Sequence, residues 1–242
     1  MPESLLPSRD VGLKAHGMKK RLAFADRTRS IVQAATVVFA EHGFERTTTK
    51  QLALAAKVSP ALLYEHFPSK EALYRAVLRQ LIKDQDALLA TLAVRRPGEE
   101  PDGATGLIVM LHSYFSACVL TNARDRNVTA HRLLLRSLAS DGTYARLLYR
   151  RSLRNNVNGL ATALDGARTH GQITGEAFSA PTAAAFIEHV GSMLLSTHLS
   201  DKPIALYTET GNELVKKAVF FCGRGLGLAN ETISRIYELR GL

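Results

Sequence analysis

The sequence has only two cysteines among its 242 residues, Cys118 and Cys222, and both lie in apolar stretches. Their spacing fits neither a zinc motif nor a disulfide framework, so we expect a reducing, cytoplasmic environment. Long apolar runs are also lacking. The longest, residues 107–120, is interrupted by His112 and Ser113 and is shorter than the about 20 apolar residues that span a bilayer. Since the N-terminus also has no signal-peptide pattern, we expect neither export nor membrane insertion.

Catalytic motifs are absent as well. The sequence has no H-E-x-x-H, G-x-S-x-G or P-loop pattern, and its eight histidines are scattered. The segment 223–227 has glycines at its first, third and fifth positions. This spacing differs from the G-x-G-x-x-G of a dinucleotide-binding loop, and no alternating strands surround it. The sequence therefore predicts a protein that is not an enzyme and that holds no metal and no cofactor.

The charge of the chain is unevenly distributed. Hydrophobic residues make up 46% of the sequence, as in a globular protein, and the net charge is +9. Residues 1–80 contain 13 lysines and arginines against 7 acidic residues, and the remainder contains 18 against 15. Two thirds of the excess positive charge thus lies in the first third of the chain. Such asymmetry favours an N-terminal module that binds a polyanion, although a basic surface kept for solubility explains the charge equally well.

Helical periodicity and chain breakers predict an all-α protein. We expect helices over about 27–42, two short helices within 47–67, and longer ones over about 69–94, 107–121, 127–139, 142–169, 180–199, 208–228 and 231–240. These divide the chain into a flexible basic arm (1–26), a small N-terminal helical domain (27–75) and a larger C-terminal helical domain (76–242). The arm either touches DNA or is simply a disordered tail, and the second interpretation is favoured.

The segment 47–74 has the local signals of a helix-turn-helix. Thr48 and Gln51 form the Thr-x-x-Gln pattern of a capping box. Ser59 can cap the next helix, and Pro60 occupies its first turn, where a missing N–H costs nothing. The turn between the two helices requires a positive φ at Lys57, which costs a non-glycine residue roughly 1–2 kcal/mol.

Residues 27–78, about a fifth of the chain, resemble the DNA-binding domain of the TetR (tetracycline-repressor-like) family. The resemblance rests on the A-x-x-x-F-x-x-x-G-F pattern over residues 35–44, on L-Y-x-H-F over 63–67 and on F-x-x-K-E-x-L over 67–73. Glycine usually occupies the position of Lys57 in this family. The resemblance implies an all-α fold: an N-terminal three-helix helix-turn-helix domain, followed by a C-terminal helical ligand-binding and dimerisation domain.

The resemblance also implies a set of DNA contacts. Phosphate contacts are expected from Thr48, Tyr64, His66 and Lys70, and base contacts from Lys50, Pro60, Ala61 and Leu62, while Thr49 is either a contact or first-turn filler. Helix N-termini favour anions, lysine can donate to guanine, and apolar side chains pack on the thymine methyl group. The alternative is that Tyr64, His66 and Leu62 only pack the small domain.

The C-terminal part is expected to pair with a second copy and to bind a small molecule. Apolar stripes over residues 186–197 and 214–226 face either a partner subunit or the monomer's own core. The candidate ligand contacts are polar and aromatic residues within apolar helices: His112, Tyr114, Phe115, His131, Tyr149, Asn155, Phe186 and His189. Each of them alone is more often a core residue than a contact. Because no paired acidic residues line these helices, a lipophilic or anionic effector is favoured.

The function implied by the resemblance is that of a homodimeric repressor, released from a palindromic DNA operator by a small-molecule effector. The helix over 69–94 crosses the domain boundary and is the expected lever. Two alternatives stay open: a DNA-binding or chromosome-organising protein that senses nothing, and a transcriptional activator.

Overall fold

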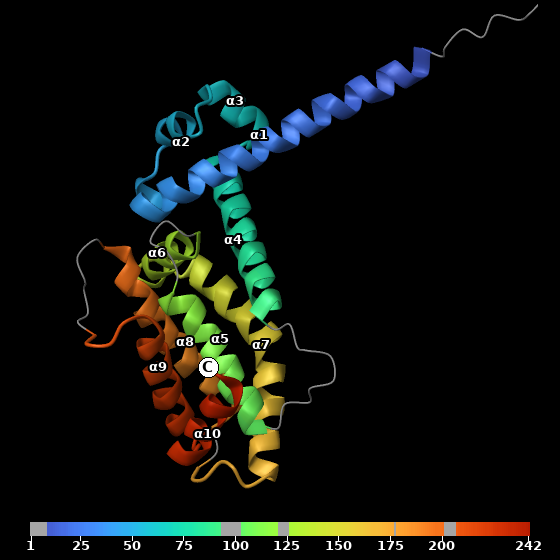
Figure 1. The fold of residues 1–242 in the computed structure, drawn as a ribbon. Helices are drawn as coiled ribbons and strands as arrows, with labels where there is room; N and C mark the ends of the chain where they lie inside the picture. The colour runs from blue at the N-terminus through green and yellow to red at the C-terminus, as the bar shows by residue number, and fades with distance from the viewer. Residues whose placement is uncertain (1–8, 93–102, 121–125, 177, 201–206) are drawn as a thin grey trace, which may run out of the picture. The chain divides into compact units, whose positions relative to one another are not determined.

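The computed structural model describes residues 9–92, 103–120, 126–176, 178–200 and 207–242. The chain divides into two compact units, residues 1–80 and 81–242. Within the described residues every regular element is a helix, and a single β-bridge joins Ile173 to Leu228 (Figure 1). The prediction of an all-α protein is therefore confirmed. None of the described helices combines the length and the apolar character that a membrane-spanning helix requires.

The first unit contains α1 (Arg9–Arg46), α2 (Thr49–Ala55), α3 (Pro60–His66) and the first part of α4 (Lys70–Leu92). The prediction that the first helix begins at about Arg27 was wrong, because α1 begins at Arg9 and includes Gly12 and Gly17 without a break. A glycine within a helix costs only about 1 kcal/mol, which does not end it. The helical path does break at Gly43, as expected, where φ is 76°.

Apolar residues from all four helices form the core of the first unit. The residues that are almost fully buried are Ile31, Ala35, Phe39, Leu52, Leu63, Leu73 and Val77. An aromatic cluster ties the end of α1 to α4, with the ring centroid of Tyr74 4.9 Å from those of both Phe39 and Phe44. Leu63 and Phe67 are buried, as their spacing predicted. This core fixes α3 with one side inward and the other toward solvent.

The turn between α2 and α3 is closed by a left-handed residue. Lys57 has a φ of 54°, and it is the sole non-glycine residue with a positive φ in the described part of the chain. The Lys57 N–H donates to the Leu54 carbonyl at 3.1 Å, and the Val58 N–H donates to the Ala53 carbonyl at 3.0 Å. This pair of bonds is the Schellman motif, which requires the left-handed conformation at the residue after the helix cap. The positive φ expected at Lys57 is confirmed.

The second unit is a bundle around α5 (Gly103–Val119), which contacts α7 (Thr143–Thr169), α8 (Ala180–Ser196), α9 (Gly211–Gly225) and α10 (Asn230–Arg240). α6 (Arg126–Leu138) packs on α7 and α8, and the short 3-10 helix η1 (Thr197–Leu199) follows α8. The crossing of α5 and α7 depends on Gly103, since a Cβ atom there would lie 1.8 Å from the Ala167 nitrogen. The helix bounds agree with the predicted ranges to within a few residues.

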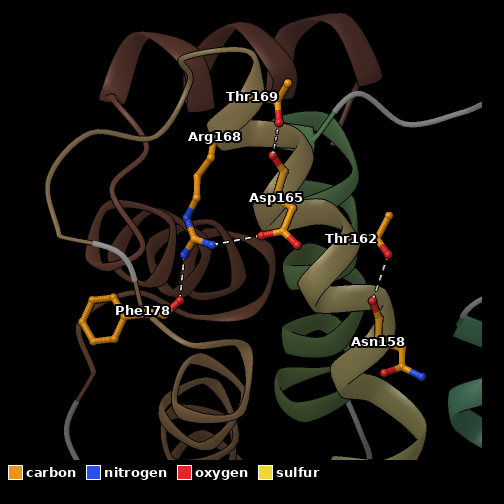
Figure 2. Close-up of polar contacts among 6 residues, drawn as sticks. All are labelled: Asn158, Thr162, Asp165, Arg168, Thr169 and Phe178. Carbon is orange, nitrogen blue, oxygen red and sulfur yellow. Dashed lines mark hydrogen bonds and ion pairs between the residues drawn. The ribbon is translucent and has the colours of Figure 1, made fainter.

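Arg168 fixes the connection between α7 and α8. Its Nη1 donates to Asp165 Oδ1 at 3.1 Å, and its Nη2 donates to the Phe178 carbonyl at 2.7 Å (Figure 2). α8 then begins at a standard start signal: Ser179 Oγ accepts from the Thr182 N–H, and proline occupies the first turn. These contacts set the direction of α8, which contributes to the candidate effector site.

Candidate nucleic-acid interface and effector site

The start of α2 is held by the predicted capping box. The Gln51 N–H donates to Thr48 Oγ1 at 3.3 Å, and the Thr48 N–H donates to Gln51 Oε1 at 2.8 Å. Thr48 and Lys50 are exposed and Thr49 is half-buried. The box satisfies two backbone donors at the positive end of the helix dipole, so this first turn is rigid and electropositive.

α3 presents a short exposed face. Ser59 Oγ accepts from the Leu62 N–H at 3.1 Å, which fixes the first turn. Pro60 and Ala61 are exposed, and the side chain of Tyr64 is 49% exposed. Leu62 is half-buried. Three of the five predicted contacts on this helix, Pro60, Ala61 and Tyr64, are therefore exposed to solvent, while the other side of the helix is anchored in the core.

His66, at the end of α3, binds back to α1. Its Nδ1 lies 2.8 Å from Thr28 Oγ1, and its ring stacks on Phe24 with centroids 4.1 Å apart. The Thr28 hydroxyl donates its single proton to the Phe24 carbonyl at 2.9 Å, so Nδ1–H of His66 is the donor to Thr28. His66 thus positions α3, whatever its second nitrogen contacts.

Phe24 was missed by sequence reasoning, because the first helix was expected to begin after it. The signal was present: Phe24, Thr28, Ile31 and Ala35 follow at spacings of four, three and four, which continue one helical face toward the N-terminus.

Lys70 is also largely engaged within the protein. Its Nζ donates to the Phe44 carbonyl at 3.0 Å and to the Thr47 carbonyl at 3.1 Å, and it lies 4.3 Å from the centre of the Phe44 ring. These carbonyls lie in the last turn of α1 and just after it, where backbone acceptors lack helical partners. An ammonium group has three N–H donors, so one remains for the phosphate contact that was predicted.

In the second unit three of the predicted effector residues, Tyr114, Tyr149 and His189, lie near one carboxyl group, that of Glu188 on α8. The hydroxyl of Tyr114 donates to Glu188 Oε2 at 2.9 Å. The Tyr114 ring lies against the backbone of α8 at Gly191, where a Cβ atom would come within 2.4 Å of it. Burial, and then the charge of Glu188, raise the pKa of Tyr114 well above its ordinary value. Sequence reasoning did not single out Glu188, because its pairing with Tyr114 joins positions 74 residues apart.

Tyr149 and His189 lie at the same place. Their rings meet edge to face with centroids 6.4 Å apart. Burial raises the pKa of Tyr149, and the charge of Glu188 adds to this shift. His189 acts in the opposite sense on Glu188, whose pKa is raised by burial and lowered in part by Tyr114 and His189. The carboxyl group therefore lies among residues of α5, α7 and α8.

His131 on α6 is a buried histidine with an unused nitrogen. Its side chain is 5% exposed, and burial lowers its pKa to about 4, while a hydrogen bond to the Ser192 backbone opposes that shift. Its Nε2 has no hydrogen-bond partner among the described residues. His131 is therefore a neutral imidazole at physiological pH, with a lone pair available at Nε2.

The remaining candidates do not join this group. His112 Nδ1 lies 3.1 Å from the Tyr237 hydroxyl on α10, and Phe115 is fully buried in the bundle core. Phe186 is 55% exposed and packs on Phe178. The side chain of Asn155 lies outside the described residues. No cluster of His, Cys, Asp or Glu suited to a metal ion occurs in the part of the chain that the structure describes.

The capped α2–α3 pair with its left-handed turn and exposed α3 face forms a helix-turn-helix, the motif that places a short helix in the major groove of DNA. Residues 31–77 match the family described as bacterial regulatory proteins, tetR family. The chain therefore carries the N-terminal domain of the TetR family.

Two curated relatives match this part of the chain. The transcriptional regulator RutR of Escherichia coli K12 is 40% identical over 89 residues, which are 37% of this chain and 40% of RutR. The regulator UidR of the same organism is 44% identical over 64 residues, which are 26% of this chain and 31% of UidR. The chain thus matches less than half the length of either relative, and both are described as HTH-type transcriptional regulators.

Solved structures resemble the whole fold at low identity. A regulatory protein of the tetR family from Rhodococcus RHA1 has a TM-score of 0.62 at 20% identity, covering 84% of this chain and 98% of that one. AibR, solved with isovaleryl coenzyme A and operator DNA, has a TM-score of 0.59 at 18% identity, covering 84% and 100%. FadR of Bacillus subtilis, solved with stearoyl-CoA, has a TM-score of 0.56 at 18% identity, covering 81% and 98%. These likenesses show a shared fold, with a helix-turn-helix domain followed by a helical domain.

Proposed function

We propose that this protein is a homodimeric, ligand-responsive transcriptional repressor that binds a palindromic operator and is released by a small-molecule effector. The observation that carries the proposal is the exposed face of α3 on a rigid, capped helix-turn-helix of TetR type. We expect the protein to act in the cytoplasm and to have no catalytic activity.

DNA reading is assigned to the first turns of α2 and α3. Lys50, Pro60 and Ala61 are exposed at these turns and are proposed to meet base edges. Thr48 and Tyr64 are proposed to contact phosphates, as is the remaining N–H of Lys70. Since His66 uses Nδ1 within the protein, its phosphate contact is proposed for Nε2.

Pairing of two copies is supported by exposed apolar side chains in the second unit. Phe186 and Met193 on α8 are 55% and 57% exposed, and Phe221 on α9 is 64% exposed. Phe186 and Met193 are seven residues apart and so lie on one face of α8. Exposed apolar groups of this size mark interaction surfaces. A two-fold dimer sets two α3 helices about one DNA turn apart, which requires a palindromic operator.

Release by an effector is proposed to act through α4. This helix runs without a break from Lys70 to Leu92, across the chain boundary between the two units. An effector that binds more tightly to a dimer with altered α3 spacing lowers the population bound to DNA. The coupling equals the difference between its affinities for the two states, typically 1–3 kcal/mol.

Selection of bound duplexes from a random DNA library tests the proposed function. We expect a palindromic site whose affinity falls steeply with salt, because phosphate contacts release counterions. A protein that remains monomeric, or that shows no preference among duplexes at low salt, would contradict the proposal. Many weak sites without a palindrome would instead support a chromosome-organising protein.

A further inference from the structure

Glu188 is a buried acid for which no lysine or arginine partner is found among the described side chains. The groups that act on its pKa, besides burial, are Tyr114 and His189, with no lysine or arginine among them. None of the ion pairs found between described side chains involves Glu188. This is unexpected in a chain with 31 lysines and arginines against 22 acidic residues. A buried carboxylate is costly unless a charge or several hydrogen bonds compensate it.

The hydrogen bonding of Glu188 is only partly complete. Among the described side chains, Tyr114 is the one found to donate to it, and the bond goes to Oε2. An ionised carboxylate can accept about four hydrogen bonds. Cys118, one turn along α5 from Tyr114, is only a weak donor, a thiol whose pKa burial, with a contribution from Glu188, raises to about 12. The carboxyl group therefore retains unused acceptor capacity.

The surroundings of Glu188 suit an organic cation. Tyr114 and Tyr149 approach it from α5 and α7, and aromatic faces attract cations as well as apolar groups. Phe115 packs edge to face on Tyr114, with centroids 5.4 Å apart, and joins this site to the apolar core of the bundle. His131 on α6 supplies a further acceptor, because its buried Nε2 has no hydrogen-bond partner among the described residues. A hydrogen bond joins the His131 ring to the backbone of Ser192, which lies one turn from Glu188 on α8. The hydrogen-bond acceptors of Glu188 and His131, with the aromatic rings near them, thus suit a ligand that has N–H donors and an apolar body.

We propose that Glu188 determines the specificity of the effector site by pairing with a protonated amine carried on an apolar or aromatic body. The inference rests on the proposed ligand-responsive function and adds the ligand class. It reverses the preference for a lipophilic or anionic effector that the sequence suggested. The unpaired carboxylate gains its counter-charge from the ligand, so ionisation of Glu188 and binding of the cation favour each other.

Three probes with the same apolar body test the charge preference: 4-phenylbutylamine, 4-phenylbutan-1-ol and 4-phenylbutanoate. Isothermal titration of the full-length protein, without DNA, gives their affinities. We expect the amine to bind at least about tenfold more tightly than the carboxylate, with the alcohol between them. The wild-type comparison needs no variant, so it stands even if substitutions disturb the fold. Binding of the carboxylate as tightly as the amine, or no measurable binding of the amine, overturns the proposal.

The variant Glu188→Gln then assigns the preference to this residue. We expect it to weaken the amine about tenfold while the alcohol changes less than about threefold. The matched control is Glu213→Gln, which removes an exposed acidic side chain on α9 and should change neither affinity. An amine affinity unchanged in Glu188→Gln shows that the Tyr114 pair only packs the core, and overturns the proposal. Operator binding by the same preparation is measured separately, so failure of the proposed regulatory function is recognised independently of these titrations.

Discussion

Lys57 occupies a backbone conformation that favours glycine, with a φ of 54°. The Schellman bonds after α2 hold it there, and the strain of a side chain in this region is about 1–2 kcal/mol. We therefore expect Lys57→Gly to raise the free energy of unfolding of the first unit by about 1 kcal/mol. The entropy that glycine adds to the unfolded chain opposes this gain and reduces it. Thermal or urea unfolding followed by circular dichroism measures it.

Ala55→Gly is the matched control for this substitution. Ala55 is exposed and lies within α2, where φ is negative and glycine relieves no strain. It should destabilise by about 1 kcal/mol. A loss of stability in both variants would mean that the turn does not strain Lys57.

His131 should make stability depend on pH. Its pKa is about 4 in the folded protein, against 6.5 for the free side chain, so the unfolded chain binds the extra proton between these values. The contribution of His131 to the free energy of unfolding is constant above pH 6.5, and it falls by about 1.4 kcal/mol for each pH unit below that value. Between pH 7 and pH 5 we expect the wild type to lose about 2 kcal/mol more than His131→Asn, whose amide can still donate to the Ser192 carbonyl. Urea unfolding at the two pH values checks this, and equal losses would contradict the buried neutral imidazole.

At the scale of single elements, α3 combines rigidity with exposure, and Tyr64 is its most informative residue. The ring is 49% exposed, so its hydroxyl contributes little to folding. A hydrogen bond to a charged phosphate contributes about 1.5–3 kcal/mol. We expect Tyr64→Phe to weaken operator binding about tenfold or more, with an unchanged melting temperature. Tyr207→Phe, at a tyrosine that is 40% exposed in the second unit, is the matched control. Equal affinities of the two variants in fluorescence anisotropy would argue for a packing role of Tyr64.

The helices whose ends have local signals could be predicted from the sequence. Thr48, Ser59 and Ser179 cap their helices through side-chain bonds to residues three positions ahead, and such bonds depend on neighbours in the chain alone. The start of α1 was missed although Ser8, a residue type that favours N-cap positions, directly precedes Arg9, because Gly12 and Gly17 indicated a flexible segment.

The side-chain hydrogen bonds that join distant parts of the chain at the candidate sites could not be predicted from residue spacing. Lys70 donates to the carbonyls of Phe44 and Thr47, which lie 26 and 23 positions earlier in the chain. The Tyr114–Glu188 bond depends on how α5 packs on α8, and on Gly191, which leaves room for the ring. Sequence reasoning therefore found Tyr114, Tyr149, His131 and His189 as candidates but not the carboxyl group around which most of them gather.

For the whole molecule, DNA affinity is expected to depend on pairing of two chains, since a single α3 reads only half an operator. We expect Met193→Asp, at a side chain that is 57% exposed on α8, to place a charge in the subunit interface and yield a monomer. The monomer should keep its helical content but bind the operator at least about a hundredfold more weakly, because the second half-site no longer binds at high effective concentration. Sedimentation and anisotropy on one preparation measure both properties.

The control for this variant is Leu239→Asp, which places the same charge at a leucine that is 77% exposed on α10, outside the exposed stripe of α8. It should remain dimeric and bind DNA as the wild type does. Since both substitutions remove an exposed apolar side chain, general effects on solubility and charge cancel between them. If Leu239→Asp rather than Met193→Asp dissociated the dimer, the subunits would pair through α10, and the exposed side chains of α8 would need another partner. If neither variant dissociated it, the interface would lie on neither surface.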